Sequence, residues 1–179
     1  MLGIAREAIA RALAGDEAWQ PGPEGLAPAL RRAQASFVTL HAAGRLRGCI
    51  GNLEPSGELA AGIARNARQA AFADPRFPPL SAAELATVSI DISVLDEPEP
   101  LAAATEAELL AVLRPGLDGL ILECGRHRGT FLPAVWRQLP QPKAFLDQLR
   151  RKAGLPEDYW SPQLRCWRYG TLQFGEGHA

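Results

Sequence analysis

Cysteine is scarce in this chain. Its 179 residues include three cysteines, Cys49, Cys124 and Cys166, which are widely separated and form no CxxC motif or Cys/His cluster. An odd number of distant cysteines argues against a disulfide framework and against a structural zinc site, and it favours a reducing compartment. We therefore expect no bound metal and no other cofactor.

Long apolar runs are also missing. No segment approaches the ~20 consecutive apolar residues that a membrane-spanning helix needs. The first apolar stretch is interrupted by Arg6, Glu7 and Arg11, where a signal peptide requires an unbroken apolar run. These absences predict a cytoplasmic protein with no membrane contact.

The chain has no excess of basic residues. Its 19 Lys and Arg residues are balanced by 20 Asp and Glu residues, for a formal net charge of −1. Nucleic-acid-binding proteins usually carry a basic surface, so this balance argues against a nucleic-acid partner. With 47% hydrophobic residues, a chain of this length can bury a core without disulfides or metals.

The residues that are present predict a mixture of helices and antiparallel strands. Residues 36–41 and 45–52 are strand-forming segments on either side of a short turn, which indicates a β-hairpin. Val88–Val94 alternates apolar and polar residues, as a strand with one buried face does. Helical spacing predicts a helix from Leu2 to Leu13 and another from a Ser56 cap to about Phe72. Ser81 and Glu84, three residues apart, predict a capping box ahead of the next strand. The predicted fold is α+β, as one domain of residues 1–179 in which an internal segment could form a smaller subdomain.

The strand segment 47–51 carries the most suggestive chemistry. Strand alternation places Leu46 and Ile50 on a core face, and Arg47 and Cys49 together on the other face. A guanidinium beside a thiol favours the thiolate, which is the nucleophilic form. The alternative is that Cys49 is a small buried apolar residue, as many free cysteines are.

Neighbouring small and polar residues could line a ligand site around this thiol. Gly48 and Gly51 leave room for a close approach, and Asn52 follows them directly. Arg76 lies in a proline-stiffened loop, which suits an anion clamp as well as a plain surface arginine.

Two residues outside the segment could move protons. Asp91 could orient Arg47 or act as a base, and the alternative is a solvent-facing strand residue. His41 could form a Cys/His pair with Cys49, and the alternative is a solvated turn histidine.

Leu46-Arg47-Gly48-Cys49-Ile50-Gly51 is, letter for letter, the signature hexapeptide of the AMMECR domain family. Bacterial and archaeal members are called protein A of the AmmeMemoRadiSam system. The resemblance runs from about Leu2 to Phe174. Further segments resemble family motifs in the same order: Phe37–Leu40, Asp74–Leu80, Val88–Leu95, Gly116–Leu120, Phe131–Trp136 and Lys152–Leu155.

The resemblance implies a two-part α+β fold, one part larger than the other, with a cleft near the hexapeptide. Bacterial members are encoded alongside a radical S-adenosylmethionine protein and a Memo-type protein related to iron-dependent dioxygenases, so these are the implied partners. The family brings no settled reaction. It often has a cysteine where this chain has Arg150-Arg151, which argues against a mechanism with a second thiol at that place.

Two functions remain open at this point. The first is an accessory component that binds a partner protein or a small anionic ligand around Arg47, Cys49 and Arg76. The second is an enzyme in which Cys49 is the nucleophile, Arg47 lowers its pKa, and His41 or Asp91 handles protons. The sequence leaves open whether the chain is an enzyme, because it shows one candidate nucleophile and no assured base.

Overall fold

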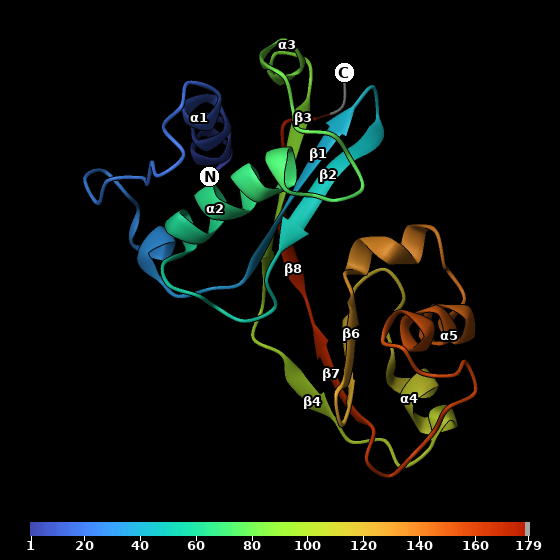
Figure 1. The fold of residues 1–179 in the computed structure, drawn as a ribbon. Helices are drawn as coiled ribbons and strands as arrows, with labels where there is room; N and C mark the ends of the chain where they lie inside the picture. Colours follow the sequence, from blue (N-terminus) through green and yellow to red (C-terminus); the bar gives the residue numbers. More distant parts are fainter. Residues whose placement is uncertain (178–179) are drawn as a thin grey trace. The chain divides into compact units, whose positions relative to one another are not determined.

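The computed structural model describes residues 1–177, whose strands form two four-stranded sheets (Figure 1). The chain divides into two compact units. Unit 1 comprises Met1–Leu95 together with the segment that begins at Leu172, and unit 2 comprises Asp96–Thr171. Helices combined with antiparallel sheets confirm the predicted α+β class.

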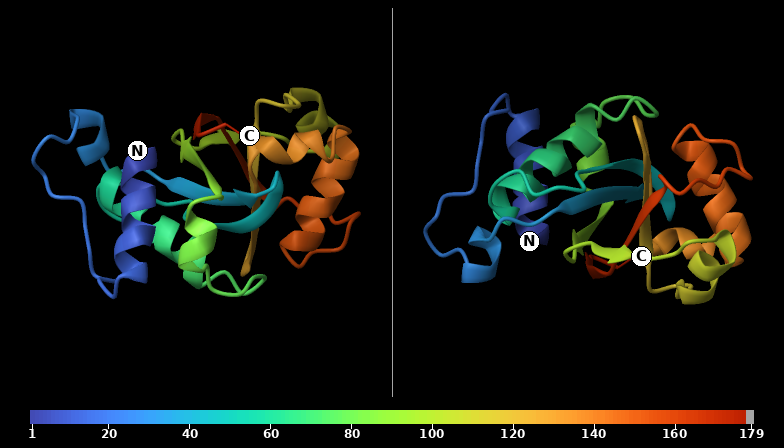
Figure 2. Two further views of the ribbon diagram at one scale, coloured as in Figure 1. Left: turned by 90° about the horizontal axis from the view of Figure 1, so that it is seen from above. Right: turned by 90° about the horizontal axis from the view of Figure 1, so that it is seen from below.

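Unit 1 is built on a sheet with the strand order β2-β1-β3-β8. Helices α1 and α2 lie on the same side of this sheet (Figures 1 and 2). The elements of this unit are α1 (Leu2–Leu13), the 3₁₀ helix η1 (Pro28–Arg31), β1 (Ser36–Ala42), β2 (Arg45–Gly51), α2 (Leu59–Phe72), α3 (Ala82–Leu85), β3 (Ser89–Leu95) and β8 (Thr171–Gly175).

The core of unit 1 lies between the sheet and these two helices. Val38, Leu40, Ile90 and Ile92 point to the helical side and are fully buried, together with Ile63 of α2. The alternate residues of β1 and β3 are half-buried on the opposite face. That opposite face is the one on which polar side chains are available for chemistry.

Unit 2 has a sheet with the order β4-β7-β5-β6 and its own apolar core. Asp96 and Gly170, near its two ends, are joined by a hydrogen bond of 3.0 Å from the Asp96 amide to the Gly170 carbonyl. Its elements are β4 (Glu99–Leu101), α4 (Glu106–Val112), β5 (Gly119–Cys124), β6 (His127–Phe131), the 3₁₀ helix η2 (Pro133–Arg137), α5 (Pro142–Lys152) and β7 (Arg165–Tyr169).

A β-bulge interrupts the pairing of β1 with β2. Leu40 pairs with Gly48, but the next residue, His41, pairs with Leu46, so Arg47 is the extra residue on β2. The bulge moves Leu46 to the face that carries His41, where it is 43% exposed. The prediction that Leu46 belongs to the core was therefore wrong, because simple alternation fails at a bulge.

The N-cap of helix α2 differs from the predicted one. Helix α2 has Glu58 as its N-cap, without a side-chain cap, so the predicted cap at Ser56 was wrong. The Ser56 hydroxyl instead accepts a hydrogen bond from Arg65. None of the helices in residues 1–177 combines the length and the apolar character that crossing a bilayer requires.

Candidate functional site

Cys49 lies on the outer edge of the unit 1 sheet, because β2 is an edge strand. The loop after α2 satisfies both of its outward-facing backbone groups. The Cys49 amide donates to Asp74 Oδ2 at 2.9 Å, and the Cys49 carbonyl accepts from Arg76 Nη2 at 3.3 Å. Since an open strand edge invites pairing with other chains, these side chains take the place of a neighbouring strand.

The Asp74 carboxylate is the hub of this arrangement, and its side chain is 2% exposed. It accepts hydrogen bonds from Arg76 Nε at 2.9 Å, from Arg76 Nη2 at 2.7 Å and from the Arg76 amide at 3.1 Å. The Arg76 side-chain bonds, more than the Cys49 amide, hold the pKa of Asp74 well below its usual range. Arg76 has a raised pKa for the same reason, yet its side chain is 53% exposed.

Arg47 occupies the bulge and points to α3. Its Nε donates to Glu84 Oε1 at 2.8 Å and its Nη2 donates to Glu84 Oε2 at 3.4 Å. These bonds, with those from the backbone and hydroxyl of Ser81, lower the pKa of Glu84 to about 2. The predicted capping box of Ser81 and Glu84 is confirmed. Arg47 is 9% exposed, and its Nη1 has no hydrogen-bond partner within residues 1–177.

Phe77 links the two arginines. The guanidinium carbon of Arg47 lies 5.9 Å from the Phe77 ring centroid, and that of Arg76 lies 5.5 Å from it. Both distances fall within the range of cation–π attraction. Two cationic groups, each held by its own carboxylate, therefore lie within cation–π distance of one half-buried ring beside the signature strand.

Cys49 is the most accessible of the three thiols. It is half-buried and accepts a hydrogen bond from the Thr39 hydroxyl, with a distance of 3.4 Å from Oγ1 to Sγ. Cys124 and Cys166 are buried, and burial raises the pKa of Cys166 to about 11. The guanidinium nearest to the Cys49 backbone is that of Arg76, whereas Arg47 is directed to Glu84.

His41 and Asp91 are brought together by the sheet. His41 Nδ1 lies 3.2 Å from Asp91 Oδ2, and Asp91 is paired in register with Thr39. Thr39 is also the partner of Cys49 in the β1–β2 ladder. The thiol and the His41–Asp91 pair therefore occupy one face of the same sheet.

The glycines and Asn52 have packing roles. A Cβ on Gly48 would lie closer than 3.0 Å to the Ala70 carbonyl oxygen of α2, and one on Gly51 would overlap Phe37. Asn52 accepts a hydrogen bond from Asn66 Nδ2 at 3.0 Å. These contacts explain the residue types without a ligand, and the predicted ligand role of the three residues stays a prediction.

Sequence reasoning missed four participants in this region: Asp74, Glu84, Thr39 and Phe77. The acid two residues before Arg76 was a usable signal for a local ion pair. Its bond to the Cys49 amide depends on tertiary structure and had no local signal. Within the part of the chain that the structure describes, no cluster of three or more His, Cys, Asp or Glu side chains could hold a metal ion.

Comparison with known proteins gives this geometry a family context. The AMMECR1 family model matches residues 2–174. A protein from Methanothermobacter thermautotrophicus is 39% identical over 178 residues, which covers 98% of this chain and 92% of the relative. One from Thermofilum pendens is 38% identical, covering 97% of this chain and 83% of its own. The crystal structure of an uncharacterized protein, PH0010 from Pyrococcus horikoshii, matches with a TM-score of 0.90 and 32% identity, over 98% of this chain and 89% of that one. The chain therefore belongs to the AMMECR1 family.

Proposed function

We propose that this chain is a cytoplasmic accessory component that binds a partner protein or a small anionic ligand around Arg47, Cys49 and Arg76. In this proposal it works with a radical S-adenosylmethionine protein and a Memo-type protein. The observation that carries the binding role is the pair of guanidinium groups fixed within 6 Å of the Phe77 ring centroid.

The two arginines are held in position before any ligand arrives. Glu84 fixes Arg47 through two nitrogens, and Asp74 fixes Arg76 through two. Side chains that are already ordered lose little entropy on binding. Arg76 is 53% exposed and is the guanidinium that a ligand can contact directly, whereas Arg47 is buried and contributes its positive charge beside the same ring. A carboxylate or phosphate group has the charge and oxygen geometry that guanidinium groups recognise.

Anion binding is tested by titrating acetate and inorganic phosphate while backbone amide signals are followed by NMR. We expect the added anion to change the chemical shifts of residues 47–51 and 74–77. We expect Arg76→Gln to weaken the binding affinity about fivefold or more. The matched control is Arg114→Gln. Arg114 is 55% exposed and bound to buried Asp118, as Arg76 is to Asp74, but it lies in unit 2. Equal weakening in the two variants, or no shifts at residues 47–51, would overturn the anion site.

Partner binding is tested by co-purification of the tagged chain with the two proposed partner proteins. A binding component should retain its partners in Cys49→Ser and lose them in Arg76→Gln. Loss of the partners in Cys49→Ser alone would instead favour a role for the thiol. Retention in both variants would place the partner contact elsewhere.

The alternative function is an enzyme with Cys49 as its nucleophile. It is favoured by the accessible thiol and by the His41–Asp91 pair on the same sheet face. The test is the pH dependence of alkylation at Cys49, mapped by mass spectrometry, with and without Arg47→Ala or Arg76→Ala. A half-reaction pH well below the ~8.5 of a free thiol, raised by either change, would support an activated thiolate. Ordinary pH dependence in every variant would eliminate it.

A further inference from the structure

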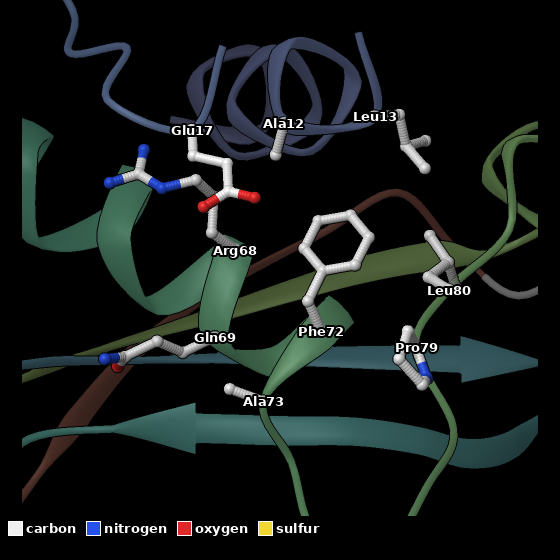
Figure 3. Close-up of a pocket in the computed structure, with 9 residues that line it drawn as sticks. All are labelled: Ala12, Leu13, Glu17, Arg68, Gln69, Phe72, Ala73, Pro79 and Leu80. Atoms are coloured by element: carbon white, nitrogen blue, oxygen red, sulfur yellow. The ribbon is translucent and has the colours of Figure 1, made fainter. Parts of the chain in front are cut away.

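A pocket of about 480 Å³ lies within unit 1 and shares no lining residue with the Cys49 site (Figure 3). Its apolar lining includes Leu13, Phe72 and Leu80, and its polar lining includes Glu17 and Arg68. This size, with an apolar wall and a few polar groups, is typical of sites for small organic ligands.

Two helices end at this pocket. Helix α1 ends at Leu13 and helix α2 ends at Phe72, and both of these residues line the pocket. The carboxyl end of a helix carries partial negative charge, which favours cations. The last turn of α2 contains no basic residue. In α1 the last-turn Arg11 is already paired with Glu7, with Nε and Oε1 2.7 Å apart.

Glu17 adds a full negative charge. Figure 3 shows its carboxylate directed from the segment after α1 into the pocket, between the Arg68 side chain and the Phe72 ring. In the described part of the chain, Glu17 makes no hydrogen bond or ion pair that would neutralise it. An aromatic face beside a carboxylate is a suitable environment for an organic cation.

Arg68 is the one positively charged residue among the described residues that line the pocket, and its guanidinium lies away from the apolar wall. Its Nη1 donates to the Trp19 carbonyl oxygen at 2.8 Å. Figure 3 shows the guanidinium turned away from the Phe72 ring. The apolar part of the pocket therefore faces Glu17 and the two helix ends.

We propose that this pocket binds a small organic ammonium ion with an apolar body, such as an arylalkylamine. The ammonium group lies against the Glu17 carboxylate and the helix ends, and the apolar body packs on Phe72, Leu13 and Leu80. This ligand class follows from the charges and the apolar wall, and it is independent of the anion site proposed above.

The experiment compares phenethylammonium with 3-phenylpropanoate, which have a similar ring and chain but opposite charge. Binding to the full chain is followed by amide chemical shifts at residues 12–17 and 69–73. The ammonium ion is expected to bind about tenfold or more tightly than the carboxylate, and Glu17→Gln is expected to weaken it about fivefold. The control Glu24→Gln removes the same charge from an exposed residue that does not line the pocket, and it should leave binding unchanged.

Three results would overturn the proposal. The first is no binding of the ammonium ion at about 10 mM, and the second is equal affinity for the two probes. The third is equal weakening by Glu17→Gln and Glu24→Gln, which would indicate a general effect of net charge. Glu17 is exposed, so its replacement leaves the fold intact and the comparison remains interpretable.

Discussion

Replacing Asp74 by asparagine tests whether this carboxylate holds the loop after α2 on the edge of β2. Asp74 accepts four hydrogen bonds, one from the Cys49 amide and three from Arg76. Each carboxylate oxygen accepts two of these hydrogen bonds. In asparagine an NH2 group, which is itself a donor, replaces one oxygen, so two of the four hydrogen bonds are lost in either orientation of the amide. A buried donor that loses its acceptor costs about 1–3 kcal/mol. Because Arg76 is half exposed and can regain water, we expect Asp74→Asn to lower the free energy of unfolding by about 2–4 kcal/mol.

The pH dependence gives a second, independent measure. The pKa of Asp74 is lowered in the folded state, so its stabilising contribution is fully present above the unfolded value of about 3.9 and is lost as the pH falls toward the folded value. The stability difference between the native chain and Asp74→Asn should therefore be constant from about pH 5 to pH 8 and shrink below about pH 4.

The assay is urea unfolding followed by circular dichroism at neutral and acidic pH. The control Asp16→Asn removes a charge from an exposed residue after α1 and should change stability by less than about 0.5 kcal/mol. A loss of less than about 0.5 kcal/mol for Asp74→Asn, or a difference that widens in acid, would refute the reasoning.

Other predictions follow from single contacts. Gly48→Ala should lower the free energy of unfolding by about 1–3 kcal/mol in urea titrations, because the added Cβ would overlap the backbone of α2. As a control, Gly3→Ala places its Cβ in open space on α1 and should raise the free energy of unfolding by about 0.5–1 kcal/mol. Equal effects would show that β2 can move away from α2. Arg150→Ala should lower the free energy of unfolding by about 3–5 kcal/mol, because removing this fully buried guanidinium leaves the carboxylates of Glu106 and Asp147 without their partner. Arg151→Ala, at an exposed position, should lower it by less than about 1 kcal/mol. Cys166 should resist iodoacetamide at pH 8 until denaturant is added, as shown by peptide mapping, and rapid native labelling would contradict its burial.

Much of unit 1 could be predicted because its signals are local. The hairpin of β1 and β2, the alternating strand β3 and the capping box at Ser81 each depend on residues within a few positions of one another. Period-two alternation and a capping pair need no knowledge of the rest of the fold. These elements were therefore found close to their observed bounds.

The site geometry was harder to predict because it depends on register. The bulge at Arg47 arises only when β2 pairs with β1, so alternation along the hexapeptide alone placed Leu46 in the core. The bond between Asp74 and the Cys49 amide joins residues 25 positions apart, and the contact of Glu84 with Arg47 joins residues 37 apart. No spacing rule reports such contacts.

The buried Arg150 shows the same limit. In the sequence it stood out only as a departure from a cysteine that the family often has. In the structure its Nη2 bonds to Glu106 Oε2 at 2.6 Å and its Nη1 to the Glu157 carbonyl at 2.7 Å. A residue of this kind has a structural role that composition and periodicity do not reveal.

The strand order of unit 1 has a consequence for synthesis on the ribosome. The edge strand β8 belongs to the sheet of β1, β2 and β3, but it is translated after the whole of unit 2. At an elongation rate of about 5–20 residues per second, unit 2 takes on the order of ten seconds to emerge. During that interval β3 has no partner on its outer side, whereas unit 2 is continuous in sequence and can fold at once. The nascent chain should therefore complete the folding of unit 2 before that of unit 1. Until β8 is synthesised, the unpaired edge of β3 is the place where a chaperone would best prevent pairing with other chains.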